Sequence, residues 1–258
     1  MHEFKTEYYF EQFNKNMTKT SERLSAYLQD PNEKNVHDVR TSIRRLDAVF
    51  KILPKKTRRK TKMKKFASEL KKFFKTNNQI RDFDIISQKL IAQQSEVHKQ
   101  ILQLVDKKRK NKLAGAKSQA ESLQNLEHPK INKDEIISAK LEKKFKKILI
   151  KSIENIQELM PKVIKDSKFV EELHRLRKEY KKLRYVLELT ENPESSNFIK
   201  NLKQLQDILG SIHDSDITID FLKKLPSKYK TDEIIKKEND SRMQMYQKFV
   251  ELHKVLQI

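Results

Sequence analysis

The segment VHDVRTSIRRLDAVF (residues 36–50) decides the fold class, because its apolar residues recur with the period of an α-helix. With the next leucine, they are spaced alternately three and four residues apart: Val36, Val39, Ile43, Leu46, Phe50 and Leu53. Such a seam is typical of helices that pack in bundles. His37, Arg40 and Arg44 each follow a seam residue directly, so they form a parallel cationic stripe about 100° round the helix. Positive charge therefore borders the face that we expect to be buried.

A second segment, LHRLRKEYKKLRYVL (residues 173–187), repeats this arrangement. Its seam consists of Leu173, Leu176, Tyr180, Leu183 and Leu187. His174, Arg177 and Lys181 form its cationic stripe, in which His174 takes the place of His37. Arginine offers a planar fork of donors to phosphate oxygens, and lysine adds a mobile charge. The alternative to phosphate binding is a charged face that is merely solvated. For the histidines, the alternative is a structural role, in which the ring donates to a backbone group or to a carboxylate across the bundle.

The repeat extends beyond these two segments. FASELKKFFKTNNQIRDFDI (residues 66–85) aligns without a gap with FIKNLKQLQDILGSIHDSDI (residues 198–217). Two matched blocks in the same order indicate a tandem duplication. We therefore predict two tandem pseudo-symmetric bundles of about four to five helices each, with repeat 1 covering about 1–128 and repeat 2 about 129–258.

The composition predicts an all-α protein. Apolar and charged residues each make up 36% of the 258 residues, a balance that suits amphipathic helices with one buried stripe. Two glycines and six prolines are too few for the turns of a β-rich fold of this length. We expect about ten helical segments, the first from about residue 3 to about residue 29. The predicted helix boundaries are Asp30-Pro31-Asn32, Pro54, Asn77-Asn78, His128-Pro129, Pro161, Asn192-Pro193, Gly210 and Pro226.

The formal net charge of +21 points to an anionic partner. A field of this size raises the local concentration of anions, so nucleic acid, an anionic membrane surface and polyphosphate are the candidate classes. The chain has no cysteine, which excludes disulfides and thiolate metal sites. We expect neither a membrane span nor a signal peptide, and hence a cytoplasmic protein.

Paired aspartates occupy matched positions in the two repeats, Asp82 and Asp84 in the first and Asp214 and Asp216 in the second. Because they follow two of the expected helix boundaries, we interpret them as caps that accept from N–H groups of the next helix. Pairing with a nearby arginine is one alternative. Mg²⁺ binding or acid–base chemistry is another.

The densest cationic run is PKKTRRKTKMKKF (residues 54–66). Such a run is typical of localisation signals or nucleic-acid patches, and it can equally extend an anion-binding surface. The segment 93–126 has weak periodicity, and we expect an exposed helix pair there. No catalytic motif is evident, since a P-loop needs more than two glycines and no His-Glu-x-x-His pattern occurs. We therefore expect no enzyme, no metal site and no cofactor.

At these segments the sequence resembles the CHAD family, the conserved histidine α-helical domain. The resemblance rests on HDVRTSIRRLDAVF with QIRDFDI in the first half, and on LHRLRKEYKKLRYVLEL with LQDILGSIHDSDI in the second. It implies a single CHAD domain of residues 1–258, in which the basic helices of two pseudo-twofold-related bundles line a central basic cavity. It also implies that inorganic polyphosphate binds in this cavity. Polyphosphate-metabolising enzymes would be partners, and polyphosphate granules would be a location.

The resemblance further implies which residues bind the anion. By position, these are His37, Arg40, Arg44, Arg45, Lys71 and Arg81 in the first half, and His174, Arg177, Lys178, Lys181, Lys182, Arg184 and Lys203 in the second. The halves differ, because Thr41 stands where the second half has Lys178, and Asp47 stands where it has Arg184. The first face is therefore less cationic in this helix, and the run 54–66 could compensate.

We predict non-enzymatic binding of inorganic polyphosphate or another polyanion, and no membrane partner. Polyphosphate has no bases to stack, which suits dense lysine and arginine without tryptophan and with phenylalanines at seam-like positions. A nucleic-acid-binding helical protein is the alternative, since the same charges attract any phosphate backbone. A polyphosphate hydrolase that uses the paired aspartates with Mg²⁺ is a third hypothesis.

Overall fold

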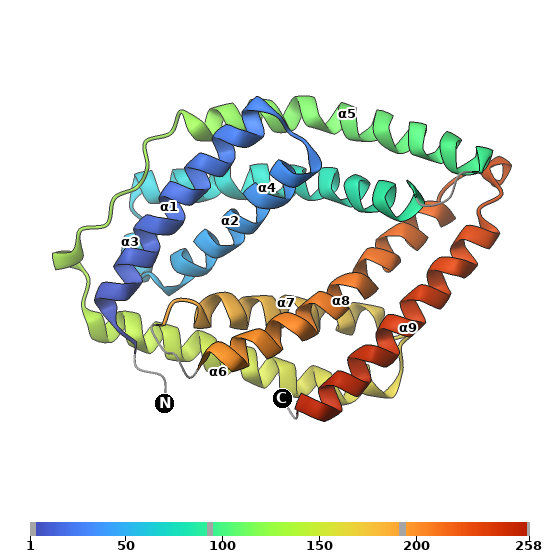
Figure 1. The fold of residues 1–258 in the computed structure, drawn as a ribbon. Coiled ribbons are helices and arrows are strands. Elements are labelled where there is room, and N and C mark those ends of the chain that lie inside the picture. The colour runs from blue at the N-terminus through green and yellow to red at the C-terminus, as the bar shows by residue number, and fades with distance from the viewer. Residues whose placement is uncertain (1–3, 92–94, 191–194, 257–258) are drawn as a thin grey trace. The chain divides into compact units, whose positions relative to one another are not determined.

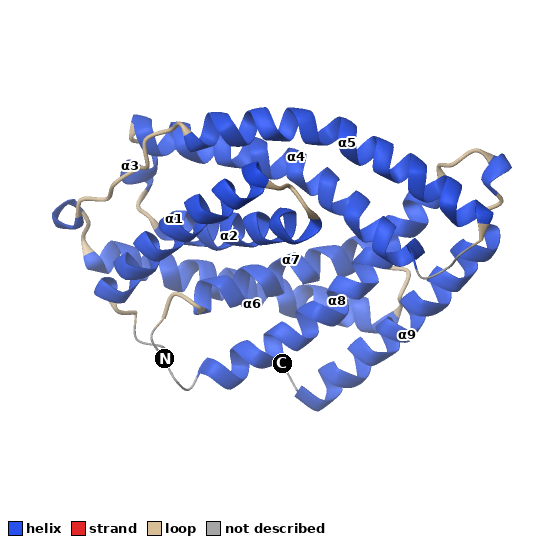
Figure 2. Cartoon of the chain, turned by 45° about the horizontal axis from the view of Figure 1, so that its top comes forward, coloured by secondary structure: helices blue, strands red, loops and turns tan. Residues whose placement is uncertain are grey.

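The computed structural model describes residues 4–91, 95–190 and 195–256 (Figure 1). The helices of these residues are α1 Thr6–Gln29, α2 Glu33–Ile52, α3 Lys55–Arg58, α4 Thr61–Ile91, α5 Glu96–Gln124, α6 Ser138–Lys165, α7 Val170–Leu187, α8 Ser195–Lys223 and α9 Asp232–Leu256. Two 3₁₀ turns, η1 Lys133–Glu135 and η2 Ser227–Tyr229, lie in the connections. The described residues contain no strand, so the all-α prediction is confirmed (Figure 2). Among these helices, none combines the length and the apolar character that a membrane span requires.

Four predicted boundaries are confirmed, because each lies between two helices: Asp30-Pro31-Asn32, Pro54, His128-Pro129 and Pro226. At the first of these, Asn32 caps α2 by accepting from the backbone N–H of Asn35 over 2.9 Å. The first helix begins at Thr6, slightly later than expected. The boundary predicted at Asn192-Pro193 and the predicted helix start at Glu3 lie outside the described residues.

Three predicted boundaries are wrong, because the helices continue through them. Asn77-Asn78 lies inside α4, Pro161 inside α6 and Gly210 inside α8. Apolar residues before and after each of these positions are buried, and their burial stabilises the helix by more than the residue at the position costs. That cost is about 1 kcal/mol for a glycine inside a helix and about 3 kcal/mol for a proline. Leu209 and Ile212, which flank Gly210, are for example 2% and 1% exposed.

The chain forms two compact units. Of the described residues, unit 1 comprises 4–84, 106–148 and 188–190, and unit 2 comprises 85–91, 95–105, 149–187 and 195–256. Each unit therefore draws segments from several parts of the chain. The repeat boundaries and the central cavity expected from the sequence stay predictions.

In unit 1, α1 packs along α2 (Figure 1). The seam residues Val36, Val39 and Leu46 of α2 are fully buried. The hydroxyl of Tyr9 in α1 donates to the carbonyl of Val49 in α2 over 2.9 Å. The inward face predicted for α2 is thus confirmed, and it determines which side of the helix remains near the surface.

In unit 2, α8 packs against both α7 and α9 (Figure 1). The core draws fully buried residues from each of these helices, including Leu176 and Tyr180 from α7, Leu202 and Leu205 from α8, and Phe249 from α9. The predicted seam of α7 is therefore confirmed. Because the cationic stripe borders this seam, packing places the stripe beside α8.

Candidate functional site

The arginine of each His-x-x-Arg motif reaches a matched position on the neighbouring helix. In unit 1, Arg40 of α2 donates from Nη1 to the carbonyls of Asn77 and Asn78 in α4, over 3.2 and 3.3 Å. In unit 2, Arg177 of α7 lies over Gly210 of α8, where an added Cβ atom would be 4.0 Å from its Nε. Gly210 is the residue that aligns with Asn78 in the repeated block. Both arginines therefore pack helices together within their own unit.

Three further predicted residues of unit 1 differ in their surroundings. The guanidinium carbon of Arg44 lies 5.4 Å from the ring centroid of Phe74, in a cation–π contact. Arg45 donates from Nε to Oε2 of Glu188 over 3.2 Å. Lys71 is exposed on α4. Of these side chains, Lys71 is the most accessible to an anion from solvent.

His37 is exposed on α2, and its Nε2 lies 3.5 Å from Oγ1 of Thr41. Although the residue is exposed overall, partial desolvation of its ring, and then the nearby guanidinium of Arg81, lower the pKa of His37 below its usual value of 6.5. Arg81 itself donates from Nη1 to Oε1 of Glu33 over 2.7 Å. At neutral pH the imidazole of His37 is therefore an uncharged hydrogen-bonding group, and the guanidinium groups supply the positive charge of this face.

The predicted lysines of unit 2 are exposed or half-buried. Lys178 and Lys203 are exposed, and Lys181 is half-buried. Lys182 pairs with Glu179 over 3.2 Å, one turn earlier on the same helix. Long side chains of this kind can extend their ammonium groups toward a bound anion.

Two of the predicted arginines are buried instead. Arg40 and Arg184 are 8% and 7% exposed. The guanidinium carbon of Arg184 lies 4.7 Å from the ring centroid of Tyr185. Because their guanidinium groups pack against the protein, these two arginines contribute more to packing than the exposed lysines do. Whether any of the predicted residues contacts an anion stays a prediction.

His174 contacts a carboxylate across the α7–α8 packing. Its Nε2 lies 2.8 Å from Oδ2 of Asp216 and 2.9 Å from Nδ1 of His213. The structural alternative for this histidine, donation to a carboxylate, is thereby confirmed. Burial, and then the nearby Arg177 guanidinium, lower the pKa of His213 to about 2. The second imidazole is therefore uncharged at neutral pH.

The interpretation of the paired aspartates as helix caps is wrong, because both pairs lie inside long helices, α4 and α8. Asp84 accepts from Nε of Arg109 over 2.5 Å, and Asp216 accepts from Nε of Arg242 over 2.5 Å. The alternative of pairing with an arginine is thus confirmed at these two positions. Within the described residues, no group of three His, Asp or Glu side chains is arranged to hold a metal ion.

Each of these arginines also binds the connection that precedes a basic helix. Arg109 of α5 donates from Nη2 to the carbonyl of Pro31 over 2.9 Å, just before α2. Arg242 of α9 donates from Nη2 to the carbonyl of Ser167 over 3.0 Å, just before α7. Sequence reasoning missed both arginines, although their separation along the chain is close to that of the repeated blocks.

The exposed helix pair expected at 93–126 is wrong, since α5 is one helix that buries part of its surface.

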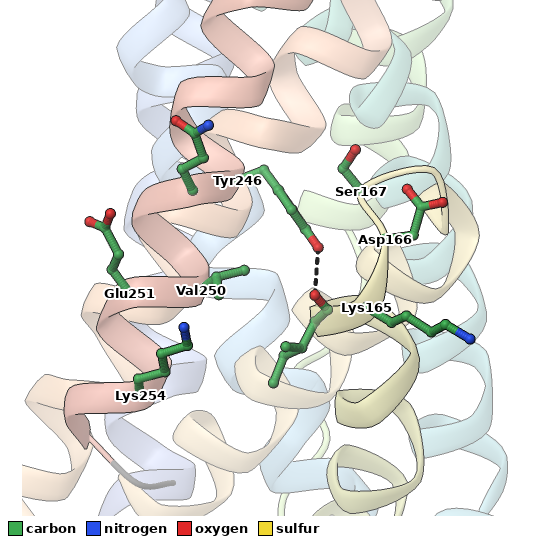
Figure 3. A pocket seen from close by; sticks show the side chains of 9 residues that line it. Lys165, Asp166, Ser167, Tyr246, Val250, Glu251 and Lys254 are labelled. Atoms are coloured by element: carbon green, nitrogen blue, oxygen red, sulfur yellow. Dashed lines mark hydrogen bonds between the residues drawn. The ribbon is translucent and has the colours of Figure 1, made fainter.

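A pocket in unit 2 lies apart from the predicted site residues (Figure 3). Tyr246, Glu251 and Lys254 of α9 line one side, and Lys165 and Asp166 at the end of α6 line the other. Its charged side chains are of both signs, so it does not resemble an anion-binding surface. The exposed cations of the basic helices are the better candidates.

Comparisons with known proteins bear on the family and on the fold. The CHAD domain family model matches residues 11–223, a range that contains both His-x-x-Arg motifs. Among solved structures, the crystal structure of the CHAD domain from the plant Ricinus communis is similar in fold, with a TM-score of 0.60 at 15% sequence identity. That match covers 93% of this chain and 84% of the plant domain. No curated protein matches the chain. Since the family model spans most of its 258 residues, the chain belongs to the CHAD domain family.

Proposed function

We propose that the protein binds inorganic polyphosphate through the cationic stripes of α2 and α7, without a catalytic step. One observation carries the proposal: in both repeats the stripe borders a buried seam, so helix packing holds its members in place. Membership of the CHAD domain family, which is linked to polyphosphate, supports the same ligand. Ordering the cations before the ligand arrives reduces the entropy that binding must overcome.

The chemistry of the surface favours a polymer without bases. Most of the 13 phenylalanines are buried, and Phe73, Phe145 and Phe249 are among the most enclosed side chains of the protein. Binders of single-stranded nucleic acid use exposed aromatic side chains as stacking platforms, worth about 1–3 kcal/mol per base. Lysine and arginine alone suffice for a chain of phosphates, because charge attraction and counterion release supply the affinity.

This proposal has consequences for location and partners. Polyphosphate is the expected ligand, and enzymes that make or degrade it are the expected functional partners. The protein would act in the cytoplasm, at granules where the polymer accumulates.

A binding titration with long-chain polyphosphate at several salt concentrations tests the proposal. We expect the affinity to fall steeply with salt, as counterion release requires. Duplex or single-stranded DNA, added at the same phosphate concentration, should not displace the polyphosphate. Displacement by DNA would contradict the proposal and favour the nucleic-acid alternative.

A phosphate-release assay with Mg²⁺ tests the absence of catalysis. We expect no release of phosphate from long-chain polyphosphate beyond that of a protein-free control. Release that disappears in Asp84→Asn, while the variant keeps its helical signal, would support the hydrolase hypothesis instead. The binding and release assays together distinguish a binding protein from an enzyme.

A further inference from the structure

Two adjacent phenylalanines of α4 have different surroundings. Phe73 is fully buried, and its ring meets that of Tyr27 edge to face, with the centroids 5.2 Å apart. Phe74 is only half-buried, because consecutive residues of a helix point about 100° apart and it lies at the border of the packed face. Its ring lies beside the cationic stripe of α2 instead of in the core.

The ring of Phe74 meets two guanidinium groups of that stripe. The guanidinium carbon of Arg40 lies 5.8 Å from the ring centroid, and that of Arg44 lies 5.4 Å from it. Arg40 is 8% exposed and is also fixed by the carbonyls of Asn77 and Asn78. Arg44 is half-buried, so part of its side chain faces the solvent. The ring thus lies between an anchored arginine and one that a ligand can reach.

A cation–π contact restrains a guanidinium without neutralising it. The attraction joins a positive charge to the face of a ring and needs no oxygen acceptor. Arg45, the next residue of α2, is held differently, since it donates from Nε to Oε2 of Glu188 over 3.2 Å and the carboxylate offsets its charge. The contact of Arg44 with the ring draws on neither its charge nor its N–H donors, which are the groups that bind phosphate oxygens.

The second repeat indicates that the fold does not require a ring at this position. Gln206 aligns with Phe74, and on the basic helix Lys181 aligns with Arg44. Unit 2 packs α7 against α8 with neither the ring nor the guanidinium at these two positions. Both features occur together in unit 1, and a ring pairs better with a planar guanidinium than with an ammonium group. The pairing therefore points to a role in holding the cation.

We propose that Phe74 is a positioning residue for anion binding by unit 1: it holds the guanidinium of Arg44 in an orientation that binds phosphate, without contacting the phosphate itself. This inference rests on the proposed function and adds a residue to its site. An arginine that is restrained in the free protein loses less side-chain entropy on binding. The ring therefore raises the affinity for polyphosphate but adds no charge, so it leaves the salt dependence of binding unchanged.

Titrations of variants with long-chain polyphosphate test this role. Phe74→Leu keeps an apolar side chain but removes the ring, and we expect the affinity to fall by about two- to tenfold. The slope of log affinity against log salt should stay that of the wild-type protein, because no charge is lost. Phe74→Tyr keeps a ring and should retain the wild-type affinity. Gln206→Leu is the matched control in unit 2, since it makes the aligned position a leucine without removing a ring, and the affinity should not change.

A second variant tests the same contact from α2, where the side chain is not part of the core. Arg44→Lys keeps the charge but removes the planar guanidinium, and we expect a loss of affinity of similar size with an unchanged salt slope. Combining it with Phe74→Leu should cause little further loss, because the ring then has no guanidinium at residue 44 to hold. Thermal unfolding shows whether each variant remains folded.

The outcomes separate this role from the proposed function. Wild-type affinity in a folded Phe74→Leu variant would overturn the role and leave polyphosphate binding intact, as would fully additive losses in the double variant. If Phe74→Leu does not fold, Arg44→Lys decides, and an unchanged affinity there would overturn the role. Absence of polyphosphate binding by the wild-type protein would overturn both.

Discussion

Arg242 and Asp216 form a buried ion pair in which Nε lies 2.5 Å from Oδ1, and their side chains are 10% and 8% exposed. Arg109 and Asp84 form the same pair in unit 1, with side chains 18% and 3% exposed. In each unit the arginine also donates to the connection before a basic helix. A single kind of contact thus links three segments of each unit and fixes where the basic helix begins.

Removal of Arg242 should destabilise the protein strongly. Arg242→Ala leaves the carboxylate of Asp216 buried without its partner, and we expect the free energy of unfolding to fall by roughly 3–5 kcal/mol. Urea denaturation followed by the helical signal measures this loss. Lys110→Ala is the control, because Lys110 pairs with Asp106 at the surface and should cost only about 0.5 kcal/mol. Equal losses of unfolding free energy in both variants would show that the buried ion pair contributes no more to stability than a surface pair.

Removal of stripe cations should weaken ligand binding more than stability. In the double variant Arg44→Ala with Lys181→Ala, we expect a lower affinity for polyphosphate and a salt dependence that is less steep by about two ion equivalents. The melting temperature and the helical signal should change little, since neither residue belongs to the buried core; the cation–π contact of Arg44 with Phe74 is worth about 0.5–1 kcal/mol, and Lys181 is only half-buried. Unfolding of the double variant at ambient temperature would show that these cations are structural.

Acidification should weaken the fold through His213. In the folded state its pKa is lowered to about 2, first by burial, whereas an ordinary histidine titrates at 6.5. Below about pH 6.5 the unfolded chain therefore binds a proton that the folded chain does not, and the free energy of unfolding falls by up to about 1.4 kcal/mol per pH unit. Denaturant titrations over this pH range measure the slope, and His213→Gln should flatten it. An unchanged slope in the variant would contradict the assignment.

Substitution of the glycine in α8 should stabilise the protein. Gly210 lies inside the helix without positive φ, and a Cβ atom there would make an ordinary contact with Arg177 at 4.0 Å. We therefore expect Gly210→Ala to raise the free energy of unfolding by about 0.5–1 kcal/mol. Gly115→Ala in α5 is the matched control, because nothing lies within 4 Å of the added atom. Thermal unfolding measures both, and a loss confined to Gly210→Ala would mean that Arg177 needs more room than this contact allows.

The helical class and the inward faces of α2 and α7 were predictable from sequence. The spacing of Val36, Val39 and Leu46 is a local property, and burial follows from it because a helix has one regular period. The positions of proline at helix ends were predictable for the same local reason, as at Pro54. The local rule failed at Gly210 and Pro161, where long-range packing supplied more free energy than the residue cost.

The sequence by itself therefore determined an all-α chain with a duplicated basic helix beside a buried seam. Only the tertiary structure decided which side chains meet: Asp216 accepts from Arg242, 26 residues away, and from His174, 42 residues away. The spacing of apolar residues shows which face of a helix is buried. It does not show which helix packs against that face, or at what position along the helix axis. Contacts between polar groups on different helices depend on that axial position, so they became visible only once the helices were placed within their unit.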